Sequence, residues 1–403
     1  MSRPYDVMVA GHLCLDLFPA IPETGASRLD ELIQPGKLVN VDALSMGTGG
    51  VVANTGLTML ALGDKVRFCA AVGDDELGRL TRQILAERGN VEGITTLDGV
   101  PSSYSIVIAP PGIDRFILHN PETNNLFGPE NLDAGQMSGC RLFHFGYPPL
   151  MRRMYIDDGR ELREVFEMAK QAGATTSCDM TLPDPNSQSG QIDWKALLAN
   201  VLPMVDLFVP SIEEALYVID PHKFKARKIE SGNSDLIEVL TPADHRELAD
   251  AILGMGAKIA VLKSGSRGFY MKTDRTERFE EMGAARPGDP ANWSQRELWA
   301  PAFATDAFCN AAGAGDSAIG GFLSAFLRGK TAEASIRFAN CCGWQNVQAP
   351  DGSSGIRTFE ETETILAEGL SALPLDPRHD GWQWSDEQQV WAASGDTLNT
   401  QTG

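Results

Sequence analysis

The sequence predicts an α/β fold in which a largely parallel sheet is covered by helices on both faces. Short apolar runs of the kind that form buried strands alternate with helical patterns along the chain. The runs occupy residues 66–72, 142–145, 207–209 and 259–262, and the helical patterns occupy residues 77–88, 159–172 and 242–254. This alternation is typical of parallel sheets. The length of 403 residues and the hydrophobic content of 43% favour one large domain with an appendage over two ordinary domains.

The first strand is expected within residues 7–18, an apolar run that Gly11 interrupts and that carries Asp16 near its end. A carboxylate there is costly unless it binds a ligand or a nearby amide, so Asp16 has either a binding or a structural role. Two other segments do not fit the alternation of strands and helices. Residues 24–45 are polar, and residues 103–119 hold two apolar runs around a Pro-Pro-Gly turn, which predicts a hairpin.

A glycine pair, Gly49 and Gly50, precedes a helical pattern of small residues that carries Asn54. Without side chains, the two glycines let the backbone approach a ligand closely. Asn54 offers both a donor and an acceptor to a hydroxyl group, and the alternative is that it bonds only the start of its own helix. Asp16 and Asn54 converge if the first strand and this helix are neighbours.

Acidic residues follow two of the expected strands, at the edge where open α/β sheets bind ligands. Asp179 comes directly after residues 174–178, and Glu214 follows the apolar run at 207–209. The alternative for Glu214 and its neighbour Glu213 is that they only stabilise the first turn of a helix.

Three segments depart from the regular pattern. Residues 220–241 are rich in charge and residues 276–295 are rich in Glu, Pro and Gly, so both are expected to be solvated surface loops. Beyond Pro374, a tail carries three tryptophans among acidic and polar residues. This tail is either a strap packed on the body or a contact between subunits, so the sequence allows a homodimer.

The most informative stretch lies at residues 310–327. Gly313, Ala314 and Gly315 carry almost no side chain and precede a helical pattern, so their amides and the helix dipole create a site for an anion. Asp316 follows them and is a candidate to accept a proton from a hydroxyl that attacks a phosphoryl group. One alternative is a plain glycine connector whose aspartate stabilises the helix dipole. Another is a dinucleotide fingerprint, which is disfavoured because that motif normally follows the first strand of a βαβ unit.

Two motifs together resemble the PfkB family of sugar and nucleoside kinases. Residues 310–316 read Asn-Ala-Ala-Gly-Ala-Gly-Asp where the family has D-T-x-G-A-G-D, so the second half is intact and the first half is not. Residues 49–63 match the other signature, a glycine pair followed by an asparagine and a small-residue helix that ends in Leu-Gly. The resemblance covers residues 5–370 and leaves residues 371–403 as a C-terminal extension.

The resemblance implies a ribokinase-like three-layer sandwich with a small β lid formed near residues 24–45 and 103–119. Such a lid excludes water that would otherwise attack ATP. The implied activity is an ATP-dependent carbohydrate kinase that phosphorylates a hydroxymethyl group of a sugar or sugar-like small molecule. The alternative from a different class is a catalytically silent ligand-binding or regulatory protein on the same fold. The identity of the sugar is not readable, because lid residues follow no fixed code.

The resemblance also assigns roles to individual residues. Asp316 is the expected base, assisted by the amides of Gly313, Ala314 and Gly315. The expected substrate contacts are Asp16, Gly49, Gly50 and Asn54. The expected ATP contacts are Gly265, Gly268 and Asn340, whereas Lys263 and Arg267 beside them are interpreted as exposed charges. Mg²⁺ is expected to be held through water by Glu214, with help from Asp179.

One position departs from the family in a way that concerns ions. In many relatives, the first aspartate of the D-T-x-G-A-G-D motif and carbonyl groups near the segment at residues 349–354 hold a monovalent cation. Asn310 replaces that aspartate here and removes one negative charge. The sequence therefore predicts that a K⁺ site is weak or absent.

Composition limits the partners and the compartment. A formal net charge of −20 opposes nucleic-acid and anionic-membrane partners. No apolar run approaches the ~18 residues of a membrane span, and no secretory signal opens the chain. The seven cysteines form no CxxC pair and are interpreted as buried hydrophobic residues in a reducing compartment, so a cytoplasmic location is expected.

Overall fold

The computed structural model describes residues 3–23, 25, 28–113, 115–349 and 353–396. Its large sheet consists of β1 (Tyr5–Gly11), β4 (Val66–Gly73), β5 (Asn90–Leu97), β8 (Cys140–Gly146), β9 (Thr175–Cys178), β10 (Leu207–Phe208), β11 (Ile259–Lys263), β12 (Phe269–Thr273), β13 (Glu297–Ala300), β14 (Gln383–Ser385) and β15 (Val390–Ala392). Its small sheet consists of β2 (Cys14–Pro19), β3 (Leu44–Gly49), β6 (Tyr104–Ile108) and β7 (Phe116–Asn120).

The helices in the described residues are α1 (Leu29–Leu32), α2 (Val51–Ala61), α3 (Glu76–Ala86), α4 (Glu122–Leu126), α5 (Ala134–Ser138), α6 (Arg152–Tyr155), α7 (Arg160–Gln171), α8 (Trp194–Val201), α9 (Ile212–Ile219), α10 (Pro221–Ser231), α11 (Pro242–Gly254), α12 (Thr276–Phe279), α13 (Pro290–Trp293), α14 (Ala314–Leu327), α15 (Ala332–Asn346) and α16 (Phe359–Glu368). None of the helices that the structure describes is long and apolar enough to cross a bilayer.

The large sheet has the strand order β14-β15-β13-β12-β11-β10-β9-β8-β1-β4-β5. From β5 to β11 the neighbouring strands are parallel, and the remaining strands are added antiparallel at one edge. The carboxyl ends of β1, β8, β9, β10 and β11 therefore lie side by side. Open α/β sheets bind their ligands at this edge.

Helices cover both faces of the large sheet. On β1, Val7 and Val9 join one hydrophobic cluster while Met8 and Ala10 join another, because successive side chains of a strand point to opposite faces. Helices α2, α14 and α15 contribute to the first cluster, and α7, α8, α9 and α11 contribute to the second. The predicted three-layer α/β sandwich is therefore confirmed.

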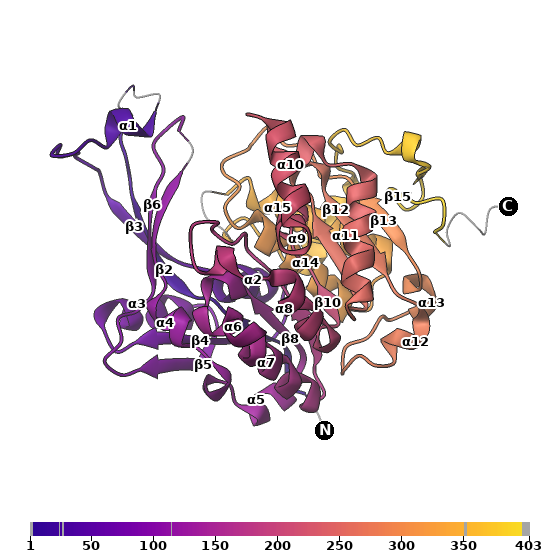
Figure 1. Cartoon of the computed structure of the whole chain (residues 1–403), viewed down its shortest axis with the longest axis horizontal. Coiled ribbons are helices and arrows are strands. Elements are labelled where there is room, and N and C mark those ends of the chain that lie inside the picture. The colour runs from indigo at the N-terminus through magenta and orange to yellow at the C-terminus, as the bar shows by residue number, and fades with distance from the viewer. Residues whose placement is uncertain (1–2, 24, 26–27, 114, 350–352, 397–403) are drawn as a thin grey trace.

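The small sheet, with the order β3-β2-β6-β7, projects from one side of the body. Figure 1 shows β2, β3 and β6 extending away from the large sheet, with α1 near their outer end. The hairpin predicted at residues 103–119 is confirmed, since β6 pairs antiparallel with β7 from Tyr104 opposite Asn120 to Ile108 opposite Phe116. Of the polar stretch at residues 24–45, residues 24, 26 and 27 lie outside the described residues.

The single first strand expected at residues 7–18 is wrong. The structure divides it into β1, in the large sheet, and β2, in the small sheet. Gly11 causes the division: its φ is +119°, and a Cβ there would lie 2.5 Å from the Gly146 carbonyl oxygen. Asp16 consequently lies inside a strand of the small sheet, and not at the end of a core strand.

The two segments expected to be solvated loops are also different in the structure. Residues 220–241 contain α10, which Asp220 caps through a hydrogen bond to the Lys223 amide. Residues 276–295 contain α12 and α13, and the Trp293 ring is buried against Phe322 and Phe326 of α14. The prediction from the average composition of each segment missed these contacts, because one or two buried aromatic residues are enough to anchor a polar segment.

The described part of the C-terminal tail packs on the body. Strand β15 pairs with β13, and β14 pairs with β15 to form the outermost strand of the large sheet. Trp382 contacts the rings of Tyr270 and Trp299. Asp396, which is fully buried, accepts hydrogen bonds from the Arg296 guanidinium at 3.0 Å and the Glu297 amide at 2.7 Å.

Candidate active site

Four polar side chains gather where neighbouring parallel strands end. Tyr147 follows β8, Asp179 follows β9, Glu214 lies in the first turn of α9 after β10, and Lys263 ends β11. The Lys263 ammonium donates a hydrogen bond to Asp179 Oδ1 at 2.7 Å and lies 3.9 Å from Glu214 Oε2. The interpretation of Lys263 as an exposed charge is wrong, because its side chain is only 12% exposed. Packing against two carboxylates holds it inside the site.

Asp316 lies in the first turn of α14 and is buried. Asn54 Nδ2, on α2, donates to one carboxylate oxygen at 2.8 Å, and the Tyr147 hydroxyl donates to both oxygens at 2.8 Å. Gly313 caps α14 with a φ of +73°, a value that favours glycine, and Ala314 and Gly315 begin the helix. The two sequence motifs, 262 residues apart at Asn54 and Asp316, therefore meet in a direct contact.

The electrostatics of these groups are dominated by burial. Burial raises the pKa of Asp179 to about 8 and also raises the pKa of Glu214, while Lys263 partly offsets both effects. Burial likewise raises the pKa of Asp316, against the lowering effects of Lys263, Asn54 and Tyr147. Burial by itself would lower the pKa of Lys263, but Asp179 and Glu214 raise it above its ordinary value. Three carboxylates thus share one ammonium group.

This charge imbalance fits a further cation. Asp179 Oδ2 is buried and has no hydrogen-bond partner among the described residues. The carboxylate oxygens of Asp179, Glu214 and Asp316 do not form a cluster in which all lie within 4.8 Å of one another. Mg²⁺ usually keeps several of its waters, so carboxylates can hold it without direct contact. Glu214 has a structural role as well, because its side chain accepts the Ser211 amide hydrogen at 2.7 Å and completes a capping box.

Asp16 lies on the inner face of the small sheet, where its carboxylate faces the glycine pair. A Cβ at Gly49 would lie 2.0 Å from an Asp16 carboxylate oxygen, and a Cβ at Gly50 would lie 2.5 Å from His12 Nδ1. The two glycines therefore make room for neighbouring side chains, a reason that the sequence did not reveal. Burial raises the pKa of Asp16, and hydrogen bonds from Cys14 and Ser105 lower it in part.

A cavity of about 380 Å³ lies on the other side of the α14 N-terminus. Its lining includes the expected residues Gly265, Gly268 and Asn340, together with Ala314, Gly315 and Lys263. Asn340 donates to the carbonyl oxygens of Ala300 and Pro301, so it shapes the wall of the cavity. The remaining lining is mostly apolar: Phe269, Ala302, Phe303, Ala304, Phe308, Ala318, Trp344, Val347 and Leu373. A flat apolar group with an anionic end would fit this cavity and the adjoining helix terminus.

The structure thus places the expected residues in three adjoining groups. Asp16, Gly49, Gly50 and Asn54 lie on the lid side, and Gly265, Gly268 and Asn340 line the cavity. Asp316, Glu214 and Asp179 lie near the α14 N-terminus, around Lys263. Sequence reasoning missed Tyr147 and Lys263 as site residues, although the signal was available: both follow apolar runs at the same strand edge that pointed to Asp179 and Glu214.

Comparisons with known proteins agree with this geometry. Residues 6–358 match the family described as pfkB family carbohydrate kinase. The chain is 26% identical over 371 residues to "Probable fructokinase-4" of Arabidopsis thaliana, covering 88% of this chain and 95% of that protein. It is 24% identical to "2-dehydro-3-deoxygluconokinase" of Bacillus subtilis (strain 168), covering 82% and 90%. The solved structure of Arabidopsis thaliana ribokinase complexed with ribose and ATP matches with a TM-score of 0.65 at 16% identity, covering 91% of this chain and 99% of that one.

Proposed function

We propose, from the premise that this chain belongs to the pfkB family of carbohydrate kinases and is an ATP-dependent sugar kinase, that it phosphorylates a hydroxymethyl group with Asp316 as the base. The observation that carries the proposal is the position of Asp316. It lies at the N-terminus of a buried helix, between the lid side and the cavity, and is held by Asn54 and Tyr147. A carboxylate so placed can accept a proton from a hydroxyl as that hydroxyl attacks a phosphoryl group.

Each residue around Asp316 has a role in this reaction. The sugar hydroxyl attacks the γ-phosphorus of ATP, its proton passes to Asp316, and ADP leaves. Amides and the dipole at the start of α14 stabilise the charge that develops on the transferred group. The Ala314 amide already donates to the Ala311 carbonyl at 3.3 Å, so we assign this stabilisation to the Gly315 and Asp316 amides. Lys263, which lines the cavity, would approach the phosphates from that side.

Glu214 and Asp179 are the residues that would hold Mg²⁺ through water. When bound, Mg²⁺ offsets the negative charge of the ATP phosphates. The buried, unpartnered Asp179 Oδ2 and the excess of carboxylates over Lys263 support this assignment. The cavity next to Gly265 would accept the adenine, with Asn340 fixing its wall.

The substrate side favours a neutral sugar. Asp16 is placed to accept hydrogen bonds from sugar hydroxyls, and the described neighbours that contact it, Cys14 and Ser105, carry no positive charge. Burial lowers the pKa of His12 and of His119 below the ordinary value of 6.5, so both rings are neutral at pH 7. A sugar acid would need a positively charged partner for its carboxylate, and neither the two neighbours of Asp16 nor the two histidines supply one. Fructose-type hexoses are therefore the first substrates to test, since several relatives are named fructokinases.

Replacing the base tests the central assignment. Asp316→Asn keeps the shape of the side chain but cannot accept the proton, so we expect turnover to fall by ~10²-fold or more while ATP and sugar affinities stay close to wild type. Turnover is measured by coupled ADP release, and both affinities by calorimetry. The control is Glu213→Gln, which removes the carboxylate beside Glu214 in the first turn of α9 and should leave turnover unchanged. Unaltered turnover in Asp316→Asn would contradict the proposal. A wild-type protein that binds both ligands but shows no turnover would favour the alternative of a catalytically silent ligand-binding protein.

The pH profile tests how the base is held. Because the Tyr147 and Asn54 hydrogen bonds favour the ionised carboxylate, Tyr147→Phe should raise the Asp316 pKa further. The active form is deprotonated, so turnover is lost as pH falls through this pKa, and the acid limb of the variant's profile should move to higher pH. Turnover at saturating MgATP is compared in wild type and variant across the same buffers, which keeps the titration of ATP common to both. An acid limb at the wild-type position would show that Tyr147 does not act on Asp316.

The ion dependence tests the departure at residue 310. Asn310 donates from Nδ2 to the Ala349 carbonyl at 3.0 Å and accepts the Ala312 amide hydrogen at 2.7 Å, so an amide lies where relatives carry a carboxylate. The neighbouring residues 350–352 lie outside the described residues. We expect turnover to require Mg²⁺ and to differ little among K⁺, Na⁺ and a bulky organic cation at matched ionic strength. Asn310→Asp should gain activation by K⁺, because a carboxylate facing a carbonyl attracts a cation. Strong K⁺ activation of the wild type would contradict this account.

The outer face of the lid supports a homodimer. Met46, Leu17, Ile106 and Leu118 are direct cross-strand partners and form one apolar row across the small sheet, with Met46 and Leu118 about half exposed. We expect light scattering to give the mass of a dimer, and Leu118→Asp to shift it toward the monomer because a charge would be buried in the contact. Ile229→Asp, at an exposed apolar residue on α10, is the control. A wild-type monomer at micromolar concentration would refute the dimer.

A further inference from the structure

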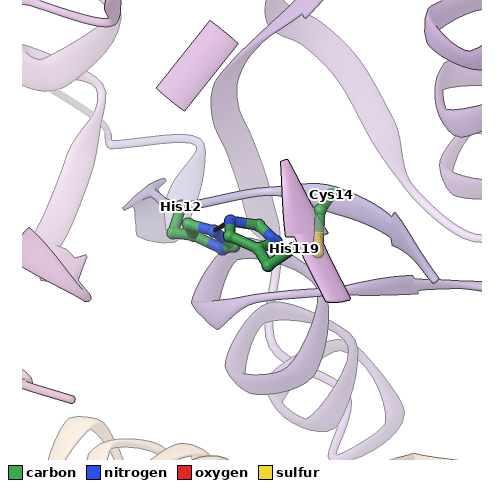
Figure 2. A group of neighbouring side chains, drawn as sticks. All are labelled: His12, Cys14 and His119. Carbon is green, nitrogen blue, oxygen red and sulfur yellow. Dashed lines mark hydrogen bonds between the residues drawn. The ribbon is translucent and has the colours of Figure 1, made fainter. Parts of the chain in front are cut away.

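A second cluster of chemically reactive side chains lies where the lid joins the body. His12, from the segment after β1, Cys14 of β2 and His119 of β7 each place one potential ligand atom within 4.8 Å of the other two. His12 Nε2 and His119 Nε2 are 3.1 Å apart. Figure 2 shows the three side chains gathered at one point between the strands. The fold brings these residues together although His12 and His119 are 107 positions apart.

The hydrogen bonds within this cluster are incomplete. His12 and Cys14 are buried, with 3% and 4% of their surface exposed. The two facing nitrogens share one hydrogen bond at most, and His12 Nδ1 has no partner among the described residues. This unpartnered nitrogen lies beside Gly50 and is not the one that faces His119, so the proposed site depends on the close approach of the three ligand atoms.

The donor atoms match one class of metal. Two imidazole nitrogens and a thiolate sulfur are ligands of Zn²⁺, whereas Mg²⁺ prefers oxygen ligands. Two nitrogens that bind Zn²⁺ at about 2.0–2.1 Å in a tetrahedral site lie about 3.3 Å apart, close to the separation of the two histidines. Asp16 Oδ1 is 3.2 Å from the Cys14 sulfur but does not lie within 4.8 Å of all three ligand atoms, so the fourth position of a tetrahedral ion would be open to water.

A neighbouring residue orients one of these ligands. Ser105 Oγ lies 3.2 Å from His119 Nδ1 and 3.4 Å from the Cys14 sulfur. A hydrogen bond to the second ring nitrogen is the usual way in which proteins fix the orientation of a metal-binding histidine. Strand pairing holds this arrangement, because Ser105 is the direct partner of both Asp16 and His119 in the small sheet.

We propose that His12, Cys14 and His119 form a Zn²⁺ site with three protein ligands and an open fourth position. On binding, the Cys14 thiol loses its proton to solvent as the sulfur bonds the metal. Because the Cys14 sulfur lies 3.2 Å from Asp16 Oδ1, an ion bound there would lie beside the carboxylate that we assign to the sugar, a consequence that rests on the proposed function. Zn²⁺ would then act as an inhibitor that competes with the sugar and not with ATP, at a site chemically separate from the Mg²⁺ held near Glu214.

The metal site is tested first, without any assay of activity. The full chain is titrated with Co²⁺ as a spectroscopic substitute for Zn²⁺, and then with Zn²⁺ to displace it. We expect one equivalent of Co²⁺ to produce a thiolate-to-metal charge-transfer band, and Cys14→Ser to abolish it. His119→Gln should weaken Zn²⁺ binding by at least about 100-fold. Cys309→Ser, which changes an exposed cysteine, is the matched control and should leave the band unchanged.

Unfolding by the substitutions is checked by the thermal midpoint of each variant. A wild-type protein without the band would overturn the metal site, and so would a band that persists in Cys14→Ser but disappears in Cys309→Ser. The inhibitory part is tested by calorimetric titration of the sugar without ATP. Zn²⁺ should weaken sugar binding in wild type and not in Cys14→Ser. Sugar affinity that Zn²⁺ leaves unchanged would overturn the competition, whereas a failure to bind any sugar would count against the proposed function and leave the Co²⁺ result to decide the metal site.

Discussion

The charge balance around Lys263 is the interaction on which the arrangement of the strand ends depends. An ion taken out of water costs several kcal/mol unless it is well paired. Lys263 bonds Asp179, lies near Glu214, and lowers the pKa of the buried Asp316, so one ammonium group connects β9, β11, α9 and α14. It cannot neutralise three carboxylates by itself. Burial raises the pKa of all three carboxyl groups, so protonation or a further cation must offset the charge that Lys263 does not neutralise.

A second constraint is steric and separates the lid from the body. Gly11 turns the chain out of the large sheet because nothing larger fits beside Gly146. Gly49 and Gly50 then leave room for Asp16 and His12 at the point where the small sheet begins. One face of the small sheet carries the paired residues Asp16, Ser105 and His119, and the opposite face carries the apolar row.

The C-terminal tail is connected to the cavity through β13. Its strand β15 pairs with β13, and Asp396 bonds Arg296, which is almost fully buried and also pairs with Glu333 of α15. The last residue of β13, Ala300, accepts a hydrogen bond from Asn340 in the cavity wall. Removing one partner of such a buried ion pair costs about 3–5 kcal/mol in general. The tail therefore supports the side of the molecule to which we assign the nucleotide.

The sequence by itself determined the α/β class, the hairpin at residues 103–119 and the two motifs that meet at Asn54 and Asp316. Each of these is encoded locally, by periodicity or by glycines at fixed offsets from a functional side chain. Only the tertiary structure decided that Asp16 belongs to a separate sheet, that Lys263 is buried, and that Tyr147 bonds Asp316. It also decided that His12 and His119 face each other. These facts depend on which strands become neighbours and on how burial changes the environment of a charge, and contacts between residues 100 or more positions apart leave no periodic signal in a single sequence.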